Sequence, residues 1–299
     1  MSRSHQRCGR DGAARAAVAV APAPIILLLF AVALAATRGL AQSYPPEPPY
    51  EGEDRIESWR GKRILVVTPH PDDETFTTGG TLALLSRGNN MIRIVVHTND
   101  NAGSRDPSMT HERLEAIRRA EEEKACEILG IPRESIVWLG HDDGMLEYVD
   151  RRELTRQVAR EIRRFKPDAL FAPDPGAPFE QYHKSDHRAA TFVTVDAIRA
   201  ARWRLYFPEL EEEGFAAWNV PVAFFYYSVN PNYTVDVTEV AELKARAAAA
   251  HISQFGDMVD HYDPNVTQEQ RDALAAELLS RATREEGRVV ERFRRSSAY

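Results

Sequence analysis

The sequence predicts an α/β domain with a mostly parallel β-sheet, because short apolar segments alternate with segments of helical length. The apolar segments read as buried strands and cover residues 63–67, 92–96, 136–139 and 169–172. A polar loop directly follows each of these strands. Ligands bind outside the carboxyl ends of the strands in such sheets, so the four loops are expected to share one rim and to carry the functional site.

Helices are expected between these strands, where residues that cap or stop a helix mark the ends. The first expected helix covers residues 77–87 and stops at Gly88. The second begins after Thr110 and stops at Gly130, and the third begins after Asp150 and ends near residue 165.

The remainder of the chain continues the alternation. A helix is expected to start near His187, followed by a strand at residues 222–227 and helices at residues 239–255 and 267–294. The final stretch, residues 281–295, is highly charged and is expected to form a solvated helix face.

The first 41 residues have the composition of a targeting segment. Four arginines precede an apolar run at residues 16–36, and Gly39 and Ala41 place small side chains before a cleavage point at Gln42. A cleaved signal peptide and export to the periplasm or the extracellular space are therefore expected. The apolar run is also long enough to span a bilayer, so an uncleaved membrane anchor is the alternative. A proline-rich linker is expected at residues 42–60 and the folded domain at residues 61–299.

Composition bounds the function further. The 299 residues are 43% hydrophobic, enough for one large or two modest domains, and carry a net charge of −7. Residues 1–41 contribute +4, so the remainder carries −11, which argues against nucleic-acid binding. Cys126 is the only cysteine after the leader, so no internal disulfide is expected, and its apolar neighbours predict a packed core thiol.

The loop after the first strand holds a dense group of ionisable residues, Thr68-Pro69-His70-Pro71-Asp72-Asp73-Glu74. Burying several charges is too costly unless they are paired, hydrogen-bonded or bound to a metal. His70 and Asp73 lie three residues apart, so a tight turn can aim both at one cation, while Asp72 points elsewhere and faces what the cation holds. This is the outline of a hydrolytic metal site with a nearby general base. In the alternative interpretation the acidic residues begin a helix and complement its dipole, although the two prolines argue against an immediate helix.

A catalytic zinc usually has three protein ligands, and His187 is the best candidate for the third. It lies at an expected helix start after the fourth strand, and therefore on the same rim, in a cluster that also holds His183 and Asp186. Two other histidines fit less well, because His111 lies on the outer turn of a capped helix and His251 lies within an alanine-rich helical segment.

The residues Pro69-His70-Pro71-Asp72-Asp73-Glu74 closely resemble the signature of the PIG-L/LmbE-like zinc deacetylases, which remove N-acyl groups from amino sugars and related amides. The similarity runs from about residue 63 to about residue 254. It implies a Rossmann-like, three-layer α/β/α fold (LmbE-like) and a Zn²⁺ ion bound by His70, Asp73 and His187. It further implies that Asp72 is the general base and that His183 polarises the carbonyl or stabilises the oxyanion.

The chain departs from the family pattern at one point. Many members place the two histidines of the second motif three residues apart. In this chain His183 and His187 are four apart, and Lys184 lies three residues before His187. Either the turn holds one extra residue, or Lys184 supplies the positive charge.

The resemblance also implies substrate contacts. Arg118 and Glu121 resemble the family's Arg-x-x-Glu, so Arg118 is expected to reach substrate hydroxyls or to form a buried ion pair. Asp143 matches an Asp-Gly loop that contacts substrate, and the adjacent Asp142 is its competitor. Ser253-Gln254 resembles a late family motif and is expected to be architectural.

The expected function is therefore zinc-dependent removal of an N-acetyl group from an amino sugar or glycoconjugate. Asn99 and Asp100 add polar groups to the rim for sugar hydroxyls, and three aromatics after the His187 helix offer a stacking wall: Trp203, Tyr206 and Phe207. Two alternatives stay open, a zinc amidase acting on a non-sugar amide and a non-catalytic sugar- or metal-binding module on the same scaffold. A nucleotide-binding domain is disfavoured, because carboxylates stand where a glycine-rich loop would be needed. The sequence makes no prediction of oligomeric state.

Overall fold

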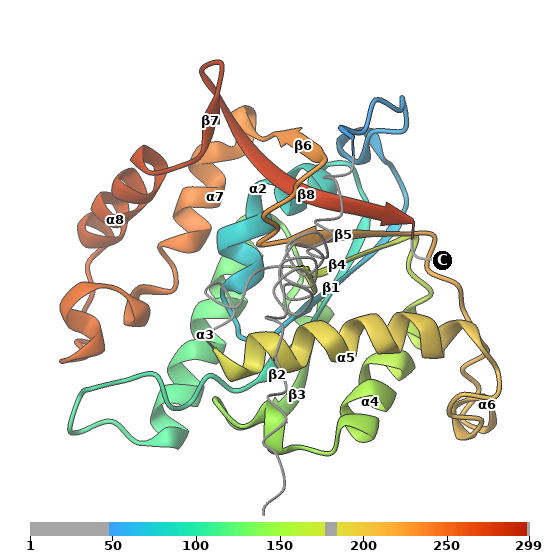
Figure 1. Cartoon of the computed structure of the whole chain (residues 1–299). Coiled ribbons are helices and arrows are strands. Elements are labelled where there is room, and N and C mark those ends of the chain that lie inside the picture. The colour runs from blue at the N-terminus through green and yellow to red at the C-terminus, as the bar shows by residue number, and fades with distance from the viewer. Residues whose placement is uncertain (1–47, 177–183, 298–299) are drawn as a thin grey trace, which may run out of the picture. The chain divides into compact units, whose positions relative to one another are not determined.

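The computed structural model describes residues 48–176 and 184–297 (Figure 1). The expected leader at residues 1–41 and the candidate oxyanion residue His183 lie outside the described residues. Within the described part of the chain, every helix is too short or too polar to cross a membrane.

One eight-stranded sheet forms the centre of the domain and confirms the α/β class. The strand order is β3-β2-β1-β4-β5-β8-β6, with β7 paired to β8. All four pairings among the first five strands are parallel, and β8 runs antiparallel to β5, β6 and β7. The bounds in chain order are β1 Arg63–Thr68, β2 Met91–Thr98, β3 Ile136–His141, β4 Ala169–Pro173, β5 Val222–Tyr226, β6 Tyr233–Asp236, β7 Arg284–Glu285 and β8 Arg288–Ser297.

Helices cover both faces of the sheet, which gives three layers (Figure 1). Successive residues of a strand point to opposite faces, and β1 shows the result: Ile64 and Val66 pack in one core cluster, whereas Leu65 and Val67 pack in the other. The first cluster includes side chains of α2 (Asp73–Arg87), α3 (His111–Leu129) and α7 (Ala241–Ala248). The second includes side chains of α4 (Arg151–Phe165) and α5 (Ser185–Arg202). The remaining elements of the described residues are α6 Glu209–Glu212, α8 Gln268–Ser280 and six 3₁₀ helices at Ile56–Ser58, Arg133–Ser135, Leu146–Tyr148, Thr238–Val240, Ile252–Gln254 and Gly256–Val259.

The capping residues act as the sequence predicts. The Thr110 side chain accepts a hydrogen bond from the Arg113 amide at the start of α3, and the Asp150 side chain accepts one from the Glu153 amide at the start of α4. Gly130 ends α3 with φ of 78°, a left-handed conformation that glycine adopts without a steric penalty.

The prediction of one helix over residues 267–294 is wrong beyond Ser280. A hairpin follows, because Glu286 and Gly287 both have positive φ, 49° and 81°, as a two-residue turn between paired strands requires. The charged stretch that follows is strand β8, which buries Val289, Val290 and Phe293 beneath its exposed charges.

Two other boundaries also need correction. The helix expected at residues 239–255 divides, since α7 ends at Ala248 and a 3₁₀ turn follows at Ile252–Gln254; the fully buried His251 therefore lies between helices. Helix α2 begins at Asp73, two residues after Pro71, rather than at residue 77. The acidic residues of the motif thus begin a helix and also belong to the candidate site.

Residues 48–60, expected to be a linker, lie against the domain. The Tyr50 amide donates a hydrogen bond to the Asn232 carbonyl, 2.7 Å, and its ring packs against Tyr233. Ile56 is fully buried in the core cluster of the α2 face.

Arg163 of α4 fixes the carboxyl end of α5. Its side chain is fully buried and its guanidinium donates hydrogen bonds of 2.8–3.2 Å to five backbone carbonyls, those of Ala200, Ala201, Trp203, Tyr206 and Phe207. The last carbonyls of a helix lack partners within the helix, so this one side chain ties the end of α5 to α4. The other end of α5 carries His187.

Candidate active site

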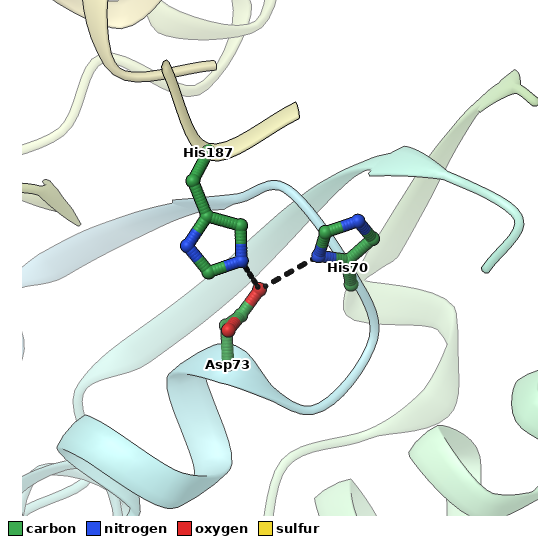
Figure 2. A group of neighbouring side chains, drawn as sticks. All are labelled: His70, Asp73 and His187. Atoms are coloured by element: carbon green, nitrogen blue, oxygen red, sulfur yellow. Dashed lines mark hydrogen bonds and ion pairs between the residues drawn. The ribbon is translucent and has the colours of Figure 1, made fainter. Parts of the chain in front are cut away.

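Three side chains predicted to bind one cation meet at the carboxyl rim of the parallel strands (Figure 2). His70 lies in the loop after β1, Asp73 in the first turn of α2, and His187 in the first turn of α5. Asp73 Oδ2 is 3.1 Å from His70 Nδ1 and 3.2 Å from His187 Nε2. The strand order places β4, and hence the chain leading to α5, directly beside β1, which brings together ligands 114 residues apart in sequence.

The donor set fits a zinc-type cation. Two imidazole nitrogens and one carboxylate oxygen are a common set of three protein ligands in catalytic zinc sites, where the fourth position is left for water or substrate. All three residues are buried and their ligand atoms lie within 4.8 Å of one another. His187 Nε2 is buried and has no hydrogen-bond partner among the described residues, although it faces Asp73. A cation between the two groups would satisfy this nitrogen.

Further groups orient these side chains. The other ring nitrogen of His70, Nε2, lies 3.2 Å from Asp186 and 3.3 Å from Asp143. Asp186 is held in turn by the amides of Gly144, 2.6 Å, and Leu146, 3.0 Å. Metal-binding histidines commonly have a carboxylate on the second nitrogen, which fixes the tautomer and the ring orientation.

Tyr227 completes the enclosure of the ligands. It follows β5, and its hydroxyl donates a 2.8 Å hydrogen bond to Asp73 Oδ1, the carboxylate oxygen that the histidines leave free. Its ring is stacked on His187, with 5.7 Å between ring centroids. Tyr227 therefore fixes both Asp73 and His187.

The ionisable groups of the site have strongly shifted pKa values. Burial acts to lower the pKa of His70, but the carboxylates of Asp143, Asp186 and Asp73 raise it well above its ordinary value. Burial acts to raise the pKa of Asp73, but the neighbouring imidazoles of His187 and His70 hold it well below its ordinary value.

Asp72 stands in a different environment from Asp73. Burial and the neighbouring charges of Asp73 and Asp100 raise the pKa of Asp72 well above its ordinary value. The residue is 7% exposed, and its carboxylate makes no hydrogen bond to another described residue. Its backbone has φ of 155° and ψ of −35°, a combination that L-residues rarely adopt. Strained backbone of this kind clusters at functional sites, where the surrounding structure holds it.

A polar pocket of about 490 Å³ opens beside His70, one of the three candidate ligands. Its lining is His70, Asp100, Gly103, Arg118, Asp143, Gly144, Lys184, Ser185, Asp186, Gln254 and Val259. Arg118 forms a buried ion pair with Asp100 and donates to the Gly103 carbonyl, 3.2 Å. The buried ion pair expected as one alternative for Arg118 is therefore present, with Asp100 as its partner.

The structure separates several sequence candidates. Asp143 lines the pocket, whereas the side chain of Asp142 accepts a hydrogen bond from Asn101, 3.0 Å. Lys184 lines the pocket and His183 lies outside the described residues. Asp100 contributes to the pocket lining and Asn99 does not.

The expected aromatic wall is wrong, because Trp203, Tyr206 and Phe207 follow the far end of α5. Helix α5 has 18 residues and is roughly 27 Å long, so its two ends cannot serve one pocket. Trp203 and Tyr206 are exposed there, and Phe207 packs in the core.

Sequence reasoning missed Tyr227 and the contributions of Asp186 and Val259, and Gln254, expected to be architectural, lines the pocket. For Tyr227 a signal was present, because it directly follows a parallel strand and therefore lies on the functional rim. Asp186 was noticed only as a neighbour of His187. Gln254 and Val259 reach the pocket through irregular chain after α7, for which the sequence offers no periodic signal.

Two histidines and an aspartate that could hold a metal ion thus lie buried at the rim of a parallel sheet, with a separate carboxylate beside them. Comparisons with known proteins identify the family. A family model described as PIG-L, GlcNAc-PI de-N-acetylase, matches residues 65–198. The diacetylchitobiose deacetylase of Thermococcus kodakarensis is 34% identical over 199 residues, 66% of this chain and 72% of that protein.

Two further relatives extend the comparison. A probable N-acetyl-alpha-D-glucosaminyl L-malate deacetylase 2 of Bacillus anthracis is 28% identical over 218 residues, 69% of this chain and 89% of that protein. The solved structure of N,N'-diacetylchitobiose deacetylase from Pyrococcus horikoshii, in complex with an inhibitor, matches with a TM-score of 0.68 and 30% identity over 79% of this chain and 84% of that chain. The protein belongs to the PIG-L family of deacetylases.

Proposed function

We propose that this protein is a zinc-dependent hydrolase that removes an N-acetyl group from an amino sugar or a glycoconjugate. The observation that carries the proposal is the meeting of His70, Asp73 and His187 beside Asp72, at the edge of a polar pocket. The relatives named as deacetylases of N-acetylated amino sugars support the substrate class.

Zinc is the proposed metal because two imidazoles and one carboxylate are ligands that zinc prefers and leave an open coordination position. A zinc ion held there supplies Lewis-acid chemistry, since it makes water a stronger acid and polarises an amide carbonyl. The protein's part is to keep the two imidazoles and the carboxylate in place, which Asp186 and Tyr227 do through His70 and Asp73.

Asp72 is the proposed general base. It neighbours the ligand Asp73 in sequence, yet its carboxylate makes no hydrogen bond to another described residue, so it is available to the substrate side. In the proposed reaction Asp72 accepts the proton of the attacking water and returns a proton to the nitrogen of the leaving amine. The C–N bond of the amide breaks, and the products are acetate and a free amine.

The developing negative charge on the amide oxygen needs a donor or a cation on the pocket side. The segment of residues 183–184 is the proposed source. Lys184 lines the pocket, and His183 is its neighbour in sequence.

The proposed sugar contacts are the charged groups of the pocket wall. Arg118 and Asp100 form a buried ion pair that presents donors and acceptors together, and Asp143 adds a second carboxylate near His70. Sugar hydroxyls both donate and accept hydrogen bonds, so a wall of this kind suits them better than it suits an apolar acyl amide. The leader at residues 1–41 supports export, where the substrate would be an envelope or extracellular glycan.

Acetate release from a panel of amides tests the proposal. The panel contains N-acetylglucosamine, N,N'-diacetylchitobiose, longer chitooligosaccharides, an N-acetylated peptide and acetanilide, and metal content is measured on the same sample. Asp72→Asn protein serves as the background control. The expected result is release from the amino sugars that far exceeds release from the other amides. A preference for the peptide or acetanilide would refute the sugar assignment while leaving the metal site intact.

A further inference from the structure

A second pocket, larger than the catalytic one, lies on the outer side of α3. It has a volume of about 660 Å³ and lies where α3, α7 and α8 come together, with α7 packed against both of the others (Figure 1). Its lining residues are Arg113, Ala116, Ile117, Ala120, Glu121, Lys124, Ile128, Arg246, Ala250, Tyr262, Gln268, Arg271 and Asp272. We refer to it as the α3–α8 groove.

The α3–α8 groove concentrates positive charge in an acidic protein. Four cations line it, Arg113, Lys124, Arg246 and Arg271, against two carboxylates, in a chain of net charge −7. Lys124 pairs with Glu127, 2.9 Å. The three arginines have no carboxylate within 4.0 Å in the described part of the chain. Their charges are therefore not neutralised by ion pairs with other described residues.

The two carboxylates of the groove are otherwise engaged. Glu121 accepts hydrogen bonds from the amide and hydroxyl of Ser253, 2.9 and 2.7 Å. Asp272 accepts a hydrogen bond from Gln268 within α8, 2.8 Å. The amino-terminal turn of α8 also borders the groove, and the positive end of its dipole favours an anion there.

An apolar surface lies beside the cations. Along α3, Ala116 and Ala120 are exposed and Ile117 and Ile128 are half-buried, so small and aliphatic side chains form the wall of the groove. Tyr262 adds an aromatic ring, and the Arg113 guanidinium lies 5.8 Å from its centroid. Cations next to apolar and aromatic surface are complementary to a ligand that has an acidic group and an apolar body.

The groove and the catalytic pocket are separate but share a wall. None of the residues lining one also lines the other. On α3, Glu121 faces the groove, and Arg118, one turn earlier, faces the catalytic pocket. Glu121 binds Ser253, and the next residue, Gln254, lines the catalytic pocket.

We propose that the α3–α8 groove is a binding site for a small organic anion, one whose sulfonate, phosphate or carboxylate group meets Arg246 and Arg271 and whose apolar body lies on the α3 wall. This site is distinct from the site of amide hydrolysis and does not depend on the proposed function. The cations of the groove select for the anionic group of the ligand, and the small alanine side chains leave room for its apolar body.

The test uses 8-anilinonaphthalene-1-sulfonate, a sulfonate with an apolar aromatic body, titrated into the folded, zinc-loaded full chain by calorimetry. Two variants address the two halves of the site. The first, Arg246→Glu with Arg271→Glu, reverses the charges and is expected to weaken binding at least about tenfold, the equivalent of one lost charged hydrogen bond. The second, Ala120→Trp, fills the groove from an exposed helix position, does not alter the core, and is expected to weaken binding by a similar factor.

Matched controls make the result decisive. Arg199→Glu with Arg284→Glu makes the same change in net charge at two exposed arginines outside the groove, and it is expected to bind the probe like the parent. Removal of zinc by a chelator is expected to leave binding unchanged. Equal affinity in parent and charge-reversed protein, equal loss in the control, or loss on chelation would each overturn the proposal. Thermal melts of all variants confirm that the compared proteins are folded.

Discussion

Glu121 connects α3 to the 3₁₀ turn at Ile252–Gln254, and its titration should be visible in the stability of the whole domain. Its side chain is almost fully buried. Burial raises its pKa from 4.5 to about 7, although the hydrogen bonds from Ser253 and the charges of Arg118 and Arg271 act in the opposite direction. The folded protein therefore binds this proton more tightly than the unfolded chain does.

The magnitude follows from linkage. One pKa unit corresponds to about 1.4 kcal/mol, so a shift of this size corresponds to about 3 kcal/mol of unfolding free energy. Because the folded pKa is raised, the contribution is fully present below about pH 4.5 and is lost as the pH rises through about 7. Glu121→Gln cannot titrate and removes this pH dependence alone.

Urea unfolding of metal-free parent and Glu121→Gln protein, measured from pH 4 to pH 8, checks the prediction. The unfolding free energy of the parent minus that of the variant should fall by about 3 kcal/mol over this range. Other groups titrate equally in both proteins, so they cancel in the difference. Glu134→Gln changes an exposed carboxylate, and the difference in unfolding free energy between this variant and the parent gives the experimental scatter. A difference that stays constant within about 1 kcal/mol would refute the argument that burial dominates at Glu121.

Three further predictions concern the site, the scaffold and the leader. Asp72→Asn should retain metal while turnover falls by roughly 10²–10⁴. Near-parent activity would show that another residue is the general base, with Glu74 the first alternative. Arg163→Met removes the buried side-chain donor that five carbonyls at and after the end of α5 share, so urea unfolding should show a loss of at least about 3 kcal/mol, and a loss below about 1 kcal/mol would contradict the role given to Arg163. Amino-terminal sequencing of exported protein should start near Gln42; a full-length cytoplasmic protein would contradict export, and a full-length membrane-bound one would support the anchor.

The parallel half of the fold was predictable because its strands are buried on both faces. Such strands read as continuous apolar runs, as at residues 63–67 and 169–172, and each is followed by a helix. The meeting of the three candidate metal ligands was predictable for a related reason. A histidine and an aspartate placed directly after a buried strand have no role in packing. The carboxyl ends of parallel strands share one rim, so a histidine that starts the helix after another strand, such as His187, lies at the same place.

The antiparallel half was not predictable in the same way. Strand β8 mixes charged and apolar residues without a regular alternation, and its partners β5 and β6 lie more than 50 residues earlier in the chain. Its charges therefore suggested a solvated helix, and only pairing with remote strands reveals the buried Val289 and Phe293. The same limit applies to Tyr227 and Val259, which reach the site through tertiary structure and carry no local motif.

Metal content of the parent and of His187→Ala protein, measured on the same preparations as acetate release, tests the central claim most directly. His111, exposed on the outer turn of α3, provides the control variant His111→Ala. The account predicts about one zinc per chain in the parent and the control, and loss of both metal and activity in His187→Ala. Metal bound by His187→Ala as tightly as by the parent would contradict the three-ligand site formed by His70, Asp73 and His187.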